Sequence, residues 1–163
     1  MGRLDRFHAA QDGPGSGFEA ALGEIRAGGK TGHWIWYVFP QLSGLGLSDM
    51  SRAYALADAG EAADYLRDST LRARLLLITD AVRDQILTRR VPLPRLLGSD
   101  VDARKLVSSL TLFEHVAQTL HGDDGLDEYG AIARAARDVL TAAAREGYAR
   151  CAYTLGRLAG EPS

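Results

Sequence analysis

The chain has 163 residues, of which 46% are apolar and 25% charged, and its formal net charge at pH 7 is −2. This length and composition predict one globular domain, residues 1–163, that buries a sizeable core. The balanced charge argues against nonspecific nucleic-acid binding, which requires clustered positive charge. No apolar segment is long enough to span a bilayer, so we expect neither a nucleic acid nor a membrane as a partner.

A single cysteine, Cys151, excludes an intramolecular disulfide, which fits a reducing compartment. The charged N-terminus is followed by no apolar signal-type segment. We therefore expect a cytoplasmic protein.

The N-terminal region carries two short helical patterns. Apolar spacing predicts a helix over residues 3–11, and glycine and proline in residues 12–15 end it. A second helix is predicted from an N-cap at Ser16 to the glycine pair at residues 28–29.

Residues 30–41, which we call the aromatic stretch, contain both tryptophans of the chain, Trp34 and Trp36. Large aromatic side chains bury the most area per residue, so a cluster this dense must pack against something. Two interpretations remain open: the stretch is a keystone of the core, or it is the wall of a pocket with a polar rim. We favour a single turn of helix that ends at Pro40.

The middle of the chain is predicted to be helical, with irregular connections. A loop with two glycines covers residues 41–48 and is free to approach another surface closely. Ser48 or Asp49 is the predicted N-cap of the next helix and Asp58 that of the one after it, and a longer helix follows from Ser69 to about residue 86. Two prolines make residues 92–97 an irregular connector.

A helix over residues 101–120 is the second informative segment. Its apolar stripe predicts a buried face, and polar residues lie on the adjoining faces at intervals of three and four. These polar residues include Asp102, Lys105, Ser108 and Ser109. Hydroxyl residues lower helix propensity, so either they bond back to the preceding turn or they serve a function or a buried polar contact.

The remaining pattern is also helical. We expect a polar loop over residues 121–127, an alanine-rich helix that reaches Gly147, and a short final helix over residues 149–158. No segment alternates with the period of a strand. The predicted fold class is all-α, a single compact helical domain of about seven to eight helices.

Familiar signatures of chemistry are missing from the chain. The four histidines lack the spacing of zinc ligands, and the sequence contains neither a P-loop nor a dinucleotide fingerprint after a strand. We therefore expect no metal and no cofactor.

Two segments resemble a known bacterial family. They read His33-Trp34-x-Trp36-x-x-Phe39-Pro40-Gln41 and Lys105-Leu106-x-Ser108-Ser109-x-Thr111-Leu112-Phe113. With further matches between residues 4 and 113, the chain is similar to domain-of-unknown-function family 1810. Members often carry the label calpastatin, but calpastatin is a disordered inhibitor, whereas this composition predicts a folded chain.

The C-terminal region departs from the pattern of this family. Its members tend to end in a G-x-x-D-x-x-T-L segment, whereas here Gly147 is followed by Cys151 and then by Thr154 and Leu155. An activity that depended on that aspartate would be absent from this chain.

The family also resembles, at the level of fold, helical domains that process nucleotides derived from NAD and ADP-ribose, which is an argument by analogy. We hypothesise a pocket between the aromatic stretch and helix 101–120 that binds a small polar or phosphorylated, nucleotide-like metabolite and hydrolyses an N-glycosidic bond. His33 or Asp102 would exchange protons as the general acid or base. We expect His33 or Gln41 to lie within reach of the segment 102–109.

The other candidate residues would bind the small-molecule ligand. Lys30 would meet an anionic group, and Trp34 or Trp36 would stack on a flat ring. Hydrogen bonds would come from Gln41, Ser48, Lys105, Ser108 and Ser109.

The alternative is a noncatalytic protein-interaction module that presents residues 33–41 to a protein partner, because aromatic anchors dominate such interfaces. A concave cleft at the aromatic stretch would favour ligand binding. A flat, exposed apolar patch would favour the protein partner.

Overall fold

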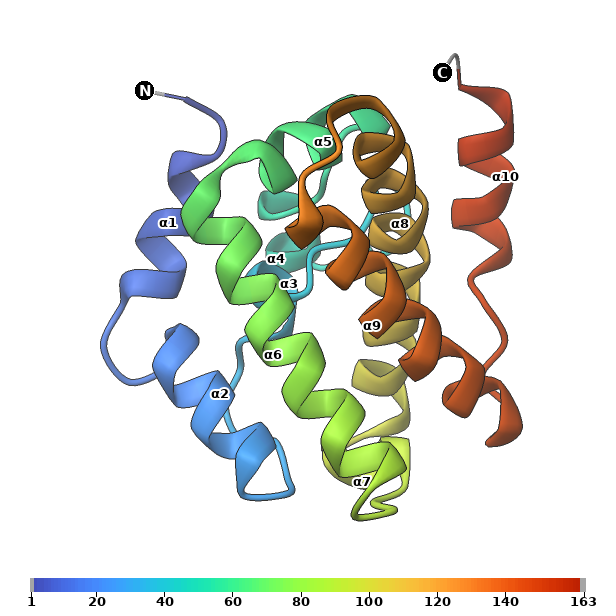
Figure 1. Ribbon diagram of the computed structural model, residues 1–163. Coiled ribbons are helices and arrows are strands. Elements are labelled where there is room, and N and C mark those ends of the chain that lie inside the picture. Colours follow the sequence, from blue (N-terminus) through green and yellow to red (C-terminus); the bar gives the residue numbers. More distant parts are fainter. Residues whose placement is uncertain (1, 162–163) are drawn as a thin grey trace.

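The computed structural model describes residues 2–161, which form ten helices (Figure 1). Their bounds are α1 Asp5–Asp12, α2 Phe18–Arg26, α3 Ile35–Val38, α4 Asp49–Ala53, α5 Ala59–Arg67, α6 Ser69–Leu87, α7 Leu93–Leu96, α8 Asp100–Asp124, α9 Asp127–Arg145 and α10 Ala152–Gly160. Within residues 2–161 there is no β-strand, and the all-α prediction is confirmed. The count exceeds seven to eight because α3, α4 and α7 are single turns of four or five residues.

Helix α8 is the central element of the fold. It begins at an N-cap, Ser99, whose hydroxyl accepts a hydrogen bond from the Asp102 N–H at 3.1 Å. It ends at Gly125, which adopts the left-handed conformation with φ of 73°. Its apolar side chains are buried around most of its circumference, and it packs against α9, α5, α10, α7 and α3. The elements that surround α8 are therefore positioned relative to one helix.

The remaining helices extend the bundle away from α8, with α1 and α2 on its far side (Figure 1). The long helices α6 and α9 pack against each other on one side, and α2 packs on α6. The last helix, α10, runs along the outside of the bundle beside α8. Among residues 2–161 no helix has both the length and the apolar character that crossing a bilayer requires.

The aromatic stretch forms the single helical turn that the sequence predicts, and it ends before Pro40. Gln11 of α1, itself buried, fixes this turn in place. Its side-chain amide donates to the Tyr37 carbonyl at 2.8 Å and to the Tyr65 hydroxyl at 3.0 Å. These buried hydrogen bonds fix α1, α3 and α5 relative to one another.

Several predicted boundaries need correction. Helix α8 continues to Asp124 through residues expected to be a loop, because exposed polar residues extend a helix until Gly125 ends it. Helix α2 has Gly17, not Ser16, at its N-cap, since the backbone of residue 17 presses against the Gly13 carbonyl and leaves no room for a Cβ. The final helix begins at residue 152 rather than 149.

The other predicted caps are confirmed. Ser48 accepts a hydrogen bond from the Ser51 N–H at 3.1 Å, and Asp58 accepts one from the Glu61 N–H at 2.8 Å. The cap of α6 is Asp68, one residue before the predicted start.

Candidate functional site

A buried ion pair joins the aromatic stretch to α8. The Lys30 Nζ lies 2.7 Å from the Asp102 Oδ2 and 2.6 Å from the Gly32 carbonyl, and the two side chains are 6% and 18% exposed. A buried ammonium must be paired, because an uncompensated charge in the interior is costly. The Lys30 ammonium group therefore donates its hydrogen bonds to protein groups, and its anionic partner is Asp102.

Trp34 is a keystone of the core. It is 0% exposed, and its indole Nε1 donates to the Glu24 Oε1 at 2.9 Å. The same oxygen accepts the backbone N–H groups of Thr31 and Gly32, each at 2.8 Å. One carboxylate thus satisfies the buried indole and orders the turn that precedes it.

The pKa of Glu24 reflects this set of contacts. Burial raises the pKa of the carboxyl group, but hydrogen bonds from the Gly32 N–H, the Trp34 indole and the Thr31 N–H lower it by more, with a further contribution from the charge of Lys30. The net pKa lies below its ordinary value of 4.5. The folded chain therefore favours the ionised carboxylate.

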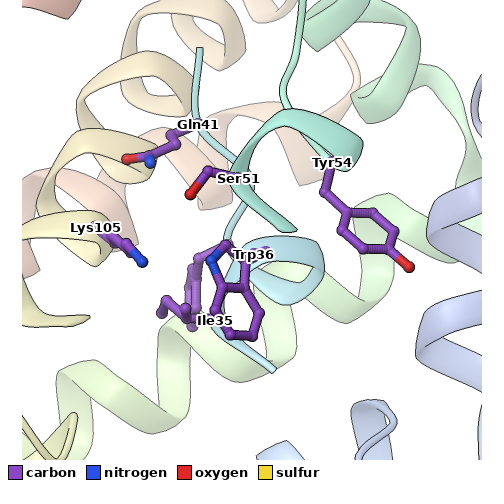
Figure 2. A pocket seen from close by; sticks show the side chains of 7 residues that line it. Ile35, Trp36, Gln41, Ser51, Tyr54 and Lys105 are labelled. Atoms are coloured by element: carbon purple, nitrogen blue, oxygen red, sulfur yellow. The ribbon is translucent and has the colours of Figure 1, made fainter. Parts of the chain in front are cut away.

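Trp36 lies beside a small cavity rather than in the core (Figure 2). The cavity has a volume of about 10 Å³, which is room for roughly one water molecule. Helices α3, α4 and α8 and the segment after α3 supply its wall, which consists of Ile35, Trp36, Phe39, Gln41, Ser51, Tyr54 and Lys105. The aromatic stretch is thus both a keystone and a pocket wall, divided between its two tryptophans.

Hydrogen-bond donors gather at this cavity. The Trp36 Nε1 is buried and has no hydrogen-bond partner among residues 2–161. The Lys105 Nζ lies 5.1 Å from the centre of the Trp36 ring, and within the described chain no carboxylate oxygen lies within 4.0 Å of it. Figure 2 shows Lys105, Gln41 and Ser51 around the same space, with the Tyr54 hydroxyl turned away.

Ser48 belongs to a second layer of this wall. It donates to the Ser51 Oγ at 3.0 Å while it caps α4, so it orients Ser51 without lining the cavity. Ser51 is the site residue that the sequence analysis missed. The local signal was the close approach that two glycines permit in the neighbouring loop, and it did not name this partner.

The structure brings together the two segments that the sequence analysis paired. Lys30 meets Asp102, while Gln41 and Trp36 share a cavity with Lys105. His33 does not join them: its side chain is exposed and does not line the cavity.

The two serines of α8 have separate surroundings. Ser108 bonds back to the Arg104 carbonyl at 3.0 Å and lines a different hollow, of about 350 Å³, with Tyr148 and Cys151. Ser109 is 0% exposed, and its hydroxyl has no hydrogen-bond partner in the described residues. It lies one helical turn beyond Lys105 on the same side of α8. Of the two explanations for these hydroxyls, bonding back to the preceding turn holds for Ser108.

The aromatic stretch presents little apolar surface. Trp34, Ile35, Tyr37, Val38 and Phe39 are each no more than 6% exposed. The flat, exposed apolar patch that would favour a protein partner is therefore not formed by these side chains in the folded chain. Among residues 2–161 no group of three or more His, Cys, Asp or Glu side chains is placed to hold a metal ion.

Comparison with known proteins places this architecture in a family. A family model described as "Protein of unknown function (DUF1810)" matches residues 2–140. The chain belongs to this family. Its fold is similar to the crystal structure of the conserved hypothetical protein Rv1873 from Mycobacterium tuberculosis, with 31% sequence identity, 97% of each chain covered and a TM-score of 0.71. No curated protein matches the chain.

The different positions of the two tryptophans predict different costs of truncation. Trp34→Ala should lower the free energy of unfolding by about 3–5 kcal/mol, because it opens a cavity in the core and removes the indole N–H that donates to Glu24. Trp36→Ala should cost clearly less, since its side chain is partly exposed and its indole N–H bonds to nothing in the protein. Equal losses for the two variants in urea unfolding would contradict this division.

The lowered pKa of Glu24 predicts a pH-dependent contribution to stability. A carboxyl group with a depressed folded-state pKa stabilises the fold above its unfolded-state pKa, and this contribution is lost as the pH falls through the folded-state value. Glu24→Gln should therefore be less stable than the natural chain at pH 7, with the difference shrinking below pH 4.5. Glu19→Gln, which changes an exposed carboxyl group on the same helix, should shift the free energy of unfolding at pH 7 by less than about 0.5 kcal/mol. A Glu24 difference that stays constant from pH 7 to pH 3 would refute the linkage.

Proposed function

We propose that the cavity beside Trp36 binds the anionic group of a small phosphorylated metabolite. The observation that carries the proposal is a buried indole N–H that has no partner within residues 2–161, next to an ammonium group that has no counter-ion among the same residues. A buried donor left unsatisfied costs about 1–3 kcal/mol, and a ligand that accepts from it recovers that cost.

An anion suits this cavity better than water does. One water molecule can accept only two hydrogen bonds, whereas Trp36, Lys105, Gln41 and Ser51 offer more donors than that around one space. A phosphate oxygen accepts several donors, and hydrogen bonds between ionised groups are about twice as strong as neutral ones. Lys105 therefore takes the role that the sequence analysis gave to Lys30.

The rest of the ligand would extend away from the cavity. A nucleotide is one such metabolite, which we propose from the fold analogy alone. Its base would lie at the mouth, since the cavity has room for little more than one oxygen atom. Neither indole is a free stacking platform: Trp34 is buried, and Lys105 covers one face of Trp36.

Binding of inorganic phosphate, AMP and acetate tests this proposal through the indole N–H signal of Trp36 in ¹⁵N nuclear magnetic resonance. We expect phosphate and AMP to shift this signal, and Lys105→Met to weaken their binding by about 10- to 100-fold, the value of one charged hydrogen bond. Trp36→Phe should weaken it too, because the ring is kept and the donor is lost.

The matched control is Arg104→Met, which removes the neighbouring cation of α8 that lines the other hollow. Its affinity for phosphate should match that of the natural chain. Binding of AMP well above that of phosphate would support the nucleotide class, and acetate as strong as phosphate would indicate a carboxylate ligand. Saturating phosphate and AMP that leave the Trp36 signal unmoved would overturn the proposal.

Hydrolysis of an N-glycosidic bond is a separate hypothesis that rests on Asp102. This carboxylate lies one turn before Lys105 on α8 and already holds the ammonium of Lys30. If it also orients water, the double variant Lys30→Met, Asp102→Asn, which leaves no buried ammonium unpaired, should abolish release of nicotinamide from NAD, followed by chromatography, while circular dichroism stays helical. No release by the natural chain would end this hypothesis and leave anion binding as the function.

A cytoplasmic location stays a prediction.

A further inference from the structure

The loop between α3 and α4 packs against two residues of the cavity wall, Gln41 and Ser51. We call residues 42–47 the glycine loop. A Cβ on Gly46 would overlap the Ser51 hydroxyl and would lie 3.7 Å from the Gln41 Nε2, so only a glycine backbone fits this closely. The position of the glycine loop therefore limits where the Ser51 and Gln41 side chains of the cavity wall can lie.

Two side chains of the last helix donate hydrogen bonds to the backbone of the glycine loop. The Tyr153 hydroxyl of α10 donates to the Ser43 carbonyl at 2.9 Å, and the Arg157 guanidinium donates to the same oxygen at 3.2 Å. Gly44 sits against the Tyr153 hydroxyl with φ of 95°, a conformation and a contact that a larger residue would disturb. Two side chains of one helix thus converge on one carbonyl group.

Arg157 also holds the segment on which the loop rests. Its second nitrogen donates to the Ala57 carbonyl at 2.8 Å. That segment pairs with the loop, because the Ser43 N–H donates to the Leu56 carbonyl at 2.8 Å and the Leu56 N–H to the Gln41 carbonyl at 2.9 Å. The hydrogen bonds therefore run without a break from α10 to the backbone of a residue that lines the cavity.

We propose that Tyr153 and Arg157 are positioning residues that hold the glycine loop against Ser51 and Gln41 of the cavity wall, so that α10 governs access to the site. The role of this access in anion binding rests on the proposed function, but the closing of the loop does not. The cavity is too small to admit a phosphorylated metabolite without movement, and the glycine loop beside its wall is a segment without helical hydrogen bonds.

Helix α10 is suited to this role because it buries few side chains against the rest of the protein. It buries only Thr154 and Leu158 among its side chains, and Tyr153 is 42% exposed. Elements with few buried contacts open at low free-energy cost. Helix α10 also lies wholly beyond residue 140, where the family match ends.

Exchange of the two indole N–H protons with solvent tests the proposal without a ligand. The Trp36 N–H has no partner in the described part of the chain, so its exchange requires only that the loop open. The Trp34 N–H, which is bonded to Glu24, is an internal reference for global opening. In the double variant Tyr153→Phe, Arg157→Gln we expect the Trp36 proton to exchange about tenfold faster, as loss of these hydrogen bonds predicts. The Trp34 proton should exchange at an unchanged rate.

Tyr148→Phe is the matched control, since it removes a tyrosine hydroxyl that bonds to Asp100 at 2.7 Å just before α10 and does not touch the loop. It should leave both rates unchanged. Acceleration of both indole protons in the double variant would show general destabilisation and overturn the proposal, as would no acceleration of the Trp36 proton.

Titration with inorganic phosphate separates this inference from the proposed function. If phosphate binds the natural chain, slows exchange of the Trp36 proton and binds the double variant several-fold more weakly, both stand. If phosphate does not bind the natural chain but the double variant still accelerates Trp36 exchange alone, the loop closure stands and the proposed function fails.

Discussion

The arrangement of the site depends on one buried ion pair, between Lys30 and Asp102. Lys30 takes this carboxylate because an ammonium group removed from water must be paired. This pair fixes the aromatic stretch against the first turn of α8. Lys105, one turn further along α8, lies over the ring of Trp36, and within residues 2–161 no carboxylate oxygen lies within 4.0 Å of its ammonium. Because Asp102 is already paired with Lys30, the charge of Lys105 remains available at the cavity.

The short helix α3 divides two neighbouring tryptophans between two environments. Trp34, at its N-cap, enters the core and gives its indole N–H to Glu24. Trp36, two residues later, turns its N–H toward the cavity. The acceptor that satisfies the first indole also orders the backbone at Thr31 and Gly32, so the stability of the core and the shape of the site rest on the same carboxylate. This coupling makes the aromatic stretch a poor candidate for a mobile element and leaves movement to the glycine loop.

Much of the fold could be predicted from the sequence because the signals that indicate a helix lie in neighbouring residues. The period of the apolar residues and the caps at Ser48 and Asp58 are properties of adjacent residues, and they were confirmed. The meeting of the aromatic stretch with α8 also followed from the sequence, since polar groups beside large aromatic side chains need partners. The extent of α8 did not, because exposed polar residues are compatible with both a loop and a helix.

The details of the site were beyond the sequence for a geometric reason. Adjacent residues of a helix point about 100° apart, so Ser108 and Ser109 enter different surroundings, and a pattern of spacing alone does not say which face meets the cavity. The choice of Lys105 over Lys30 depended on which ammonium pairs with Asp102, a contact between residues far apart in the chain. Ser51 and the contacts of α10 join residues far apart in the chain, and no local pattern encodes such a pairing.

The contacts between α10 and the glycine loop have a consequence for how this protein can vary. Tyr153 and Arg157 bind carbonyl oxygens, which every residue type possesses, so they place no demand on the side chains of Ser43 and Ala57. Relatives are free to exchange those two residues and keep the same grip. Gly44 has no such freedom, since its backbone angle and the tyrosine hydroxyl against it both exclude a side chain. Among relatives we therefore expect substitutions at Ser43 and Ala57, whose carbonyl groups accept the hydrogen bonds, and we expect Gly44 to be retained.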